Sequence, residues 1–201
     1  MLEPILDICE ETFRIALFPN NLSIEFLSAA LPEDMVNEAK AKYRSKKRIV
    51  EWLSVRYYLR ESFGRYDIDY RSNGSPYIIG SNEHIGISHS KSFIAIAISD
   101  KEIGIDVEDV DARVLRIKEA FFSEDELREC AKSDNETKAL TLMWSAKESI
   151  YKLLQTEGLS PKNEIRLYSP ETSTISARVG NKDITVHYVF HTGTVITYAM
   201  L

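Results

Sequence analysis

One stretch of the chain, residues 84–108, constrains the fold more than any other. Alternating Ile and Ala residues run up to a break at Asp100. The alternation then resumes with Ile103, Ile105 and Val107. Successive side chains of a strand point to opposite faces of a sheet, and β-branched residues favour strands. The stretch therefore predicts strands separated by a short turn, so a fold for this chain has to be built around a sheet.

The other elements are predicted from the spacing of apolar residues and from the positions of Gly and Pro. In the first part of the chain we expect short strands over 12–18 and 22–28, a helical region over 32–64, and a strand, a turn and a strand over 66–79. In the second part we expect helices over 113–120 and 135–155, with a capped helix that begins after Ser123 between them. Three strands are expected from residue 165 onward. The first part of the chain thus has the order strands, helices, strands, and the second part has the order helices, strands.

This order predicts an α+β fold of two similar α/β halves, each with a small, mostly antiparallel sheet packed by helices. The pattern changes near residue 104, so we expect an N-terminal half over 1–104 and a C-terminal half over 105–201. The two halves share no convincing sequence repeat, and the duplication rests on the pattern of elements alone.

The composition excludes several classes of protein. The 201 residues are 44% hydrophobic and 28% charged, as in a globular protein, and the net charge of −6 argues against a general nucleic-acid binder. Cys9 and Cys130 are too few for a disulfide framework. The acidic N-terminus does not resemble a signal peptide, and no window reaches the roughly 18 apolar residues of a membrane span. We therefore expect a cytoplasmic protein without a membrane or nucleic-acid partner.

The charge is unevenly distributed along the chain. Residues 40–65 hold nine Lys and Arg residues and two Glu residues, which gives this segment +7 and leaves −13 for the rest. A basic segment in an acidic protein can steer an anionic partner toward it. The alternative is a solvated face of a helix.

Two carboxylates stand close together at the end of the predicted sheet. In Gly104-Ile105-Asp106-Val107-Glu108, residues two apart in a strand share a face, so Asp106 and Glu108 lie side by side. Adjacent carboxylates repel unless a cation or a proton intervenes, and oxygen ligands suit Mg²⁺. The alternative is a solvated rim of the sheet.

A predicted helix carries a second group of charged residues. Trp144, Glu148 and Lys152 recur at a spacing of four residues and form one stripe, flanked by Lys147. The alternative is an amphipathic helix with an exposed Glu148–Lys152 pair. Burial of the large Trp144 side chain, however, would draw its neighbours toward a cleft, where they need partners.

A third segment is Ile87-Ser88-His89-Ser90. In a strand the two serines face away from His89, which argues against a catalytic triad. His89 is better interpreted as a donor to an anion, and the alternative is a structural histidine at the end of a strand.

Together these segments resemble the 4′-phosphopantetheinyl transferase superfamily, in its Sfp-type (surfactin-synthetase-activating) branch. The resemblance spans roughly residues 45–155. It rests on four motifs in order: ISHS at 87–90, GIDVE at 104–108, Phe121-Phe122-Ser123 with Glu126, and WSAKESIYK at 144–152.

The resemblance implies an enzyme that moves the 4′-phosphopantetheine arm of coenzyme A to a serine of an acyl or peptidyl carrier protein, with release of adenosine 3′,5′-bisphosphate. Asp106, Glu108 and Glu148 match the family's Mg²⁺ ligands. Glu148 also matches the proposed base, although a Mg²⁺-bound water is an alternative acceptor. Lys152 matches the lysine at the leaving bisphosphate.

The resemblance also places coenzyme A phosphates in the N-terminal half. Ser88 and His89 match positions that hold the 3′-phosphate, and Lys147 matches a lysine near the phosphates. Of the basic segment, Arg56 fits the family pattern best and Arg48 next. The family often has Lys-Pro where this chain has Ser75-Pro76, so one phosphate-binding lysine is missing.

Two other functions stay open at this point. One is a non-catalytic relative that binds coenzyme A or a carrier, and the other is a Mg²⁺-dependent hydrolase of a pyrophosphate. The sequence leaves the choice of carrier open. By resemblance, residues 109–135 line the carrier contact and the protein is a monomer.

Overall fold

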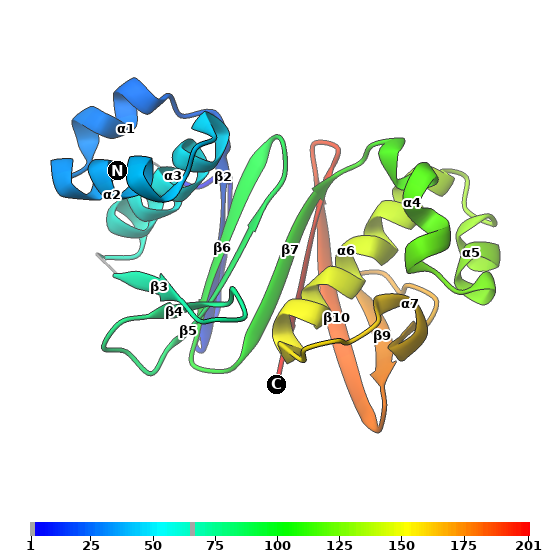
Figure 1. Ribbon diagram of the computed structural model, residues 1–201. Helices are drawn as coiled ribbons and strands as arrows, with labels where there is room; N and C mark the ends of the chain where they lie inside the picture. Colours follow the sequence, from blue (N-terminus) through cyan, green and yellow to red (C-terminus); the bar gives the residue numbers. More distant parts are fainter. Residues whose placement is uncertain (1–2, 65–66) are drawn as a thin grey trace.

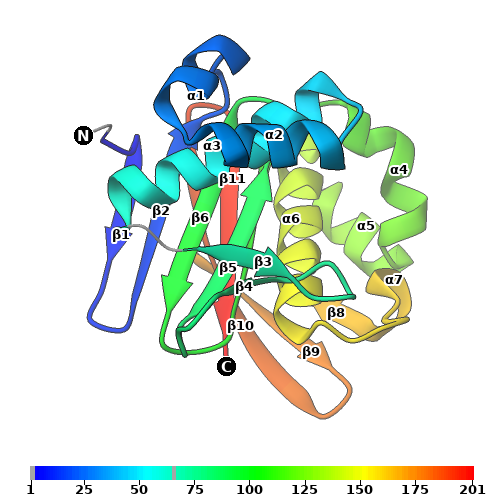
Figure 2. The same ribbon diagram turned by 60° about the vertical axis from the view of Figure 1, so that its left-hand side comes forward.

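Two antiparallel sheets lie side by side, each covered by helices of its own half of the chain (Figures 1 and 2). A computed structural model describes residues 3–64 and 67–201. The α+β fold of two similar halves is thereby confirmed. The start of the strand expected from residue 66 and Arg65 of the basic segment lie outside the described residues.

The N-terminal half contains a four-stranded sheet in the order β1-β2-β6-β5, a two-stranded hairpin β3-β4 and three helices. Its elements are β1 (Leu6–Cys9), β2 (Phe13–Pro19), α1 (Ile24–Ala30), α2 (Glu33–Lys42), α3 (Lys46–Ser62), β3 (Ile68–Tyr70), β4 (Pro76–Ile78), β5 (His84–His89) and β6 (Phe93–Ser99). The predicted strands over 84–99 are therefore confirmed.

The C-terminal half contains a five-stranded sheet in the order β7-β11-β10-β9-β8. Its elements are β7 (Ile103–Asp109), α4 (Arg113–Phe121), α5 (Glu124–Cys130), α6 (Glu136–Leu154), α7 (Pro161–Glu164), β8 (Ile165–Leu167), β9 (Thr174–Val179), β10 (Lys182–His191) and β11 (Thr194–Met200). The boundary that we propose between the halves, at residue 104, falls within β7. Among the described residues, no helix is both long and apolar enough to cross a bilayer.

Two expectations for individual elements, those for residues 22–28 and for the tail, were wrong, and the expected helical region over 32–64 is confirmed but divided. The segment 22–28 is not a strand but lies largely in α1 (Ile24–Ala30), because the Ser23 hydroxyl accepts a hydrogen bond from the amide of Phe26 and Leu27 is buried in the same core cluster as Trp52. The helical region over 32–64 is two helices, interrupted between Lys42 and Lys46. The tail holds four strands, because the short β8 precedes the three expected strands.

The two halves meet through small side chains. On β6, Ile94 and Ile96 face α3, while Ala95 and Ala97 face the second sheet and pack with Ile105. Because strand side chains alternate, β6 can fill the core beneath α3 with large residues and still allow the second sheet to approach closely. The seam between the halves is therefore apolar and tightly packed.

Gly104 permits a similarly close approach between β7 and the helix α6. A Cβ atom at this position would lie 2.0 Å from the carbonyl oxygen of Ser149 and 2.5 Å from the amide nitrogen of Leu153, both on the backbone of α6. A side chain would therefore separate strand from helix. Gly104 fixes the distance between β7 and α6.

We predict that Gly104→Ala lowers the free energy of unfolding by about 3 kcal/mol, because the backbone of α6 cannot yield without breaking its hydrogen bonds. Gly86→Ala is the matched control, since the closest atom to its Cβ atom would be the side-chain atom Ile105 Cγ2, at 2.8 Å, and the nearest backbone atom, the carbonyl oxygen of Ile103, would lie at 3.6 Å. Urea denaturation measures both. Equal losses in the two variants would contradict this account of Gly104.

Candidate functional site

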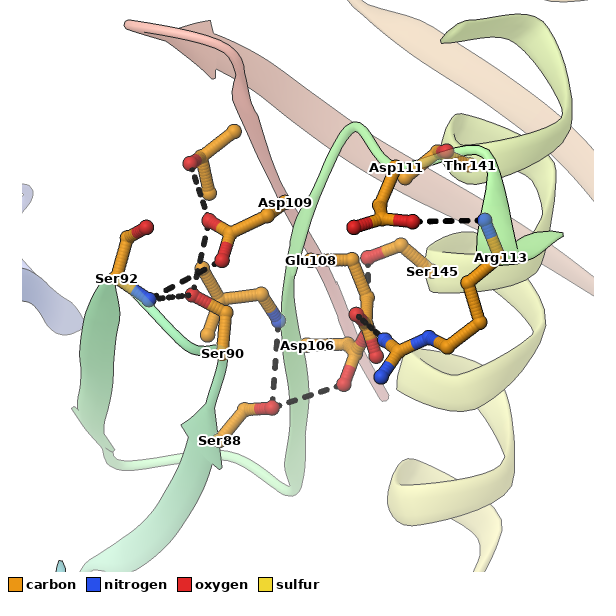
Figure 3. Close-up of polar contacts among 12 residues, drawn as sticks. Ser88, Ser90, Ser92, Asp106, Glu108, Asp109, Asp111, Arg113, Thr141 and Ser145 are labelled. Carbon is orange, nitrogen blue, oxygen red and sulfur yellow. Dashed lines mark hydrogen bonds and ion pairs between the residues drawn. The ribbon is translucent and has the colours of Figure 1, made fainter. Parts of the chain in front are cut away.

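The buried carboxylate of Asp106 receives hydrogen bonds from three side chains, one on β5 and two on α6. Its Oδ1 atom accepts from Ser88 Oγ at 2.8 Å and from Lys152 Nζ at 2.7 Å, and its Oδ2 atom accepts from Ser145 Oγ at 2.8 Å. Asp106 is only 3% exposed. Figure 3 shows the serine of β5, the aspartate of β7 and α6 converging at this point. The fold therefore brings Asp106, Lys152 and Ser88 together.

Glu108 lies two residues further along β7, on the side of Asp106. Its Oε2 atom is 3.4 Å from Nη2 of Arg113 at the start of α4. Burial, followed by the charge of Asp106, raises the pKa of Glu108 to about 8, although Arg113 and Lys152 oppose this shift. A second negative charge at this position is thus unfavourable without a further cation.

Glu148 adds a third carboxyl group from α6. Burial and then the charge of Asp106 raise its pKa above the ordinary value, and Lys152 acts in the opposite direction. Asp106 therefore raises the pKa of both neighbouring carboxyl groups. Asp106, Glu108 and Glu148 therefore form a group of mutually repelling carboxylates, with Lys152 beside them.

This donor set fits a divalent cation by its chemistry. Carboxylate oxygens are the ligands that Mg²⁺ prefers, and a cation would relieve the repulsion that, after burial, contributes to both raised pKa values. Within the described residues, however, no three acidic, His or Cys side chains are arranged as a ready metal site. At Asp106, moreover, both oxygens already accept hydrogen bonds from Ser88, Ser145 and Lys152. A cation would have to compete with Lys152.

Ser88 and His89 point to opposite sides of β5. Ser88 faces β7, where its Oγ atom also accepts a hydrogen bond from the amide of Val107 at 3.3 Å. The Nε2 atom of His89 is buried and has no hydrogen-bond partner among the residues described. Burial, then the charges of Lys152, Arg48 and Lys47, lowers the pKa of His89 to about 4. A neutral imidazole in a field of cations is suited to meet an anion.

The predicted phosphate ligand Lys147 lies elsewhere. It is fully buried and its Nζ atom donates to Glu126 Oε2 at 2.8 Å and to the carbonyl oxygen of Pro161 at 2.9 Å. The ion pair ties α6 to the capped start of α5, since Glu126 also accepts from the amide of Ser123. This placement argues against a phosphate contact by Lys147.

The two predicted arginines also differ in position. Arg56 is buried, with its guanidinium carbon 3.2 Å from the centre of the Trp52 ring and a hydrogen bond to the carbonyl oxygen of Ile68. Arg48 is exposed at the start of α3, with a long ion pair of 3.9 Å to Glu51. Arg48 can therefore reach an anion beside His89, whereas Arg56 is engaged inside the N-terminal half.

Two clefts flank the Asp106 group. One, of about 530 Å³, lies beside the carboxylates and the turn after β5 and is lined in part by Lys47, Glu51, His89, Lys91, Glu108, Arg113 and Trp144. The other, of about 570 Å³, lies between the β3-β4 hairpin and the end of α6 and is lined in part by Asn73, Ser75, Pro76, Ile87, Tyr151, Lys152 and Gln155. We name them the turn cleft and the hairpin cleft.

Sequence reasoning missed Ser145. It stands three residues before Glu148 and seven before Lys152, so it shares their face of α6, and this spacing was the signal that could have identified it. Its hydroxyl group also lies 2.9 Å from Oγ1 of Thr197 on β11. Ser145 thereby connects α6 to two neighbouring strands of the second sheet, β7 and β11.

We predict that Ser145→Ala lowers the free energy of unfolding by about 1–3 kcal/mol, because Oδ2 of Asp106 loses its donor in a buried place. Ser149→Ala is the control: Ser149 is equally buried on α6, but its hydroxyl group donates only to the carbonyl oxygen of Ala146 in the same helix. Chemical denaturation should show the larger loss for Ser145→Ala. A larger loss for Ser149→Ala would rule out this role of Ser145.

Comparisons with known proteins agree on one family. Residues 102–199 match the model of the 4′-phosphopantetheinyl transferase superfamily. The chain is 27% identical over 150 residues to the 4′-phosphopantetheinyl transferase gsp of Aneurinibacillus migulanus, which covers 72% of this chain and 62% of that protein. It is 37% identical over 82 residues to a 4′-phosphopantetheinyl transferase of Bacillus subtilis, which covers 39% of this chain and 37% of that protein. The matched regions thus span less than two thirds of these relatives.

Proposed function

The chain belongs to the 4′-phosphopantetheinyl transferase superfamily, and we propose that it transfers the 4′-phosphopantetheine arm of coenzyme A to a serine of a carrier protein. Adenosine 3′,5′-bisphosphate would be the second product. The observation that carries this proposal is the meeting of Asp106, Glu108, Glu148 and Lys152 between two clefts. We further propose that the enzyme acts as a cytoplasmic monomer, as the resemblance implies.

The two clefts suit a long, anionic substrate. Lys152 lines the hairpin cleft and Glu108 lines the turn cleft, and both belong to the group around Asp106. We propose that the pyrophosphate of coenzyme A lies at this junction. His89 and Arg48 would then hold the 3′-phosphate, whereas Ser88 contributes through Asp106 and Lys152.

We propose Mg²⁺ as the cofactor, with Asp106, Glu108 and Glu148 as the residues that would hold it. When bound, the ion would neutralise negative charge on the pyrophosphate during transfer. The chain's own Lys152 supports the same change, because its ammonium group would stabilise the charge that develops on the leaving bisphosphate. Glu148, as a carboxylate, would accept the proton of the attacking serine.

Mass spectrometry of a carrier protein tests this function. The protein is incubated with coenzyme A, Mg²⁺ and an apo carrier, and we expect the carrier to gain the mass of one phosphopantetheine arm. Coenzyme A binding without a mass gain on any of several carriers would support a non-catalytic relative. Release of adenosine 3′,5′-bisphosphate without a carrier would support the hydrolase.

In this assay we predict that Glu148→Gln lowers the rate of transfer by at least about 100-fold, because an amide cannot accept the serine proton or ligate Mg²⁺ with a full charge. Coenzyme A binding should persist in part. Glu171→Gln, an exposed position in the loop before β9, is the matched control and should transfer at the parental rate. Transfer by Glu148→Gln at that same rate would remove Glu148 from the mechanism.

The cation can be tested without turnover. We predict that millimolar Mg²⁺ raises the midpoint of thermal unfolding by about 2–4 °C, because a ligand that binds only the folded state stabilises it. The Glu108→Gln variant removes one proposed ligand and should show a smaller shift. An unchanged midpoint in the parent, in the presence and absence of coenzyme A, would contradict the Mg²⁺ site.

A further inference from the structure

Asp109, the last residue of β7, holds a turn of the other half of the protein. Its Oδ1 atom accepts from Ser90 Oγ at 3.1 Å and from Thr194 Oγ1 at 2.8 Å. Its Oδ2 atom accepts from the backbone amide of Ser92 at 3.1 Å. These contacts, drawn in Figure 3, join β7 and β11 of the C-terminal half to the turn between β5 and β6.

The same turn is fixed from its other side by Asn20. The side-chain Nδ2 atom of Asn20 donates to the carbonyl oxygen of Ser90 at 2.9 Å. The backbone N–H group of Asn20 donates to the carbonyl oxygen of Ser92 at 2.8 Å. The Ser90 hydroxyl group also accepts from the amides of Ser92 and Phe93. Asp109 therefore completes an anchor around residues 90–92.

The anchored turn presents two side chains to the turn cleft. His89 precedes it and Lys91 is its central residue, and both line the cleft together with Lys47. Lys91 is exposed, and no ion pair engages it within residues 3–64 and 67–201. Its ammonium group is thus available to an anion that reaches His89.

The charge of Asp109 opposes anion binding at this place, since the carboxylate itself lines the turn cleft. A carboxylate that acted only through its charge would repel a phosphate. Both Asp109 oxygens are, however, engaged by donors of the turn and of β11. Its structural and electrostatic effects on a bound phosphate therefore have opposite signs, which makes them separable by experiment.

We propose that Lys91 binds the 3′-phosphate of the nucleotide together with His89, and that Asp109 is the positioning residue that holds the turn for this contact. The inference rests on the proposed function, which brings a 3′-phosphate to His89. It adds a cation from the turn to the site, and it assigns the orientation of that cation to a carboxylate of the other half.

Calorimetric binding of adenosine 3′,5′-bisphosphate and of adenosine 5′-monophosphate tests the proposal. The two probes differ only in the 3′-phosphate. We expect Asp109→Asn to weaken binding of the bisphosphate about fivefold to tenfold, as for the loss of one hydrogen bond, and to leave the monophosphate unchanged. Lys91→Gln should do the same, and the double variant should lose less than the product of the two factors.

Two further variants separate position from charge. Glu51→Gln removes a carboxylate of the same cleft that makes only long contacts of 3.6 and 3.9 Å to Lys47 and Arg48, so bisphosphate binding should become tighter. Asp100→Asn, in the exposed turn between β6 and β7, should change neither probe. Tighter bisphosphate binding by Asp109→Asn would show a charge effect alone and would overturn the positioning role.

Hydrogen exchange provides a readout that needs no ligand. In Asp109→Asn the amide of Ser92 should exchange faster than in the parent, while amides in the centre of β6 should not change. If Asp109→Asn does not fold, Ser90→Ala removes the Oγ donor from the same anchor and takes its place. Unchanged exchange at Ser92 with an unchanged preference for the bisphosphate would overturn the inference.

The outcomes also separate this inference from the proposed function. A parent protein that modifies a carrier, with Asp109→Asn and Lys91→Gln retaining the parental preference for the bisphosphate, refutes the inference alone. A parent that neither modifies a carrier nor distinguishes the two nucleotides refutes both.

Discussion

The burial of one negative charge, that of Asp106, constrains how the two halves of this protein meet. A carboxylate that is removed from water costs free energy unless donors and a cation surround it. Here the donors come from β5 and α6, which belong to different halves, and the cation is Lys152. A shift of either half would leave the charge without a partner. The position of the Asp106 group is therefore coupled to the packing of the two halves.

Small residues make this meeting possible. Ala95 and Ala97 let the two sheets approach, and Gly104 lets β7 lie against the backbone of α6. A larger residue at any of these positions would separate β5, β7 and α6, and the hydrogen bonds to Asp106 would lengthen. Apolar packing thus sets distances to which the polar group is sensitive, which explains why the GIDVE segment begins with glycine.

Much of the candidate site could be predicted because most of its charged residues lie in two short segments of the sequence. Asp106 and Glu108 share a face by strand alternation, and Glu148 and Lys152 share a face by helical spacing. The placement of Lys147 could not be predicted, because one residue of rotation on α6 turns it from the cleft to the buried Glu126. The spacing of Ser145 places it on the face of Glu148 and Lys152, but its partner Asp106 and the partners of Asp109 lie far away in the sequence, and no local pattern reveals those contacts.

The helix α1 illustrates a different limit. A short apolar run such as residues 22–28 suits a strand or a helix by composition, and the cap at Ser23 with the burial of Leu27 decides the outcome. The overall order of strands and helices was nevertheless sufficient for the fold class, because longer segments carry clear periodicity. Local errors of this kind do not disturb the contact between the two halves, beside which the Asp106 group lies.

Each sheet is built from one continuous part of the chain, with β6 ending the first and β7 beginning the second. On the ribosome, the complete first sheet would therefore emerge before any part of the second. Its surface of Ile15, Leu17, Ala95 and Ala97, which β7 and β11 later cover, would meanwhile face water. Until β7 has been synthesised, this exposed apolar surface would favour aggregation of the nascent N-terminal half.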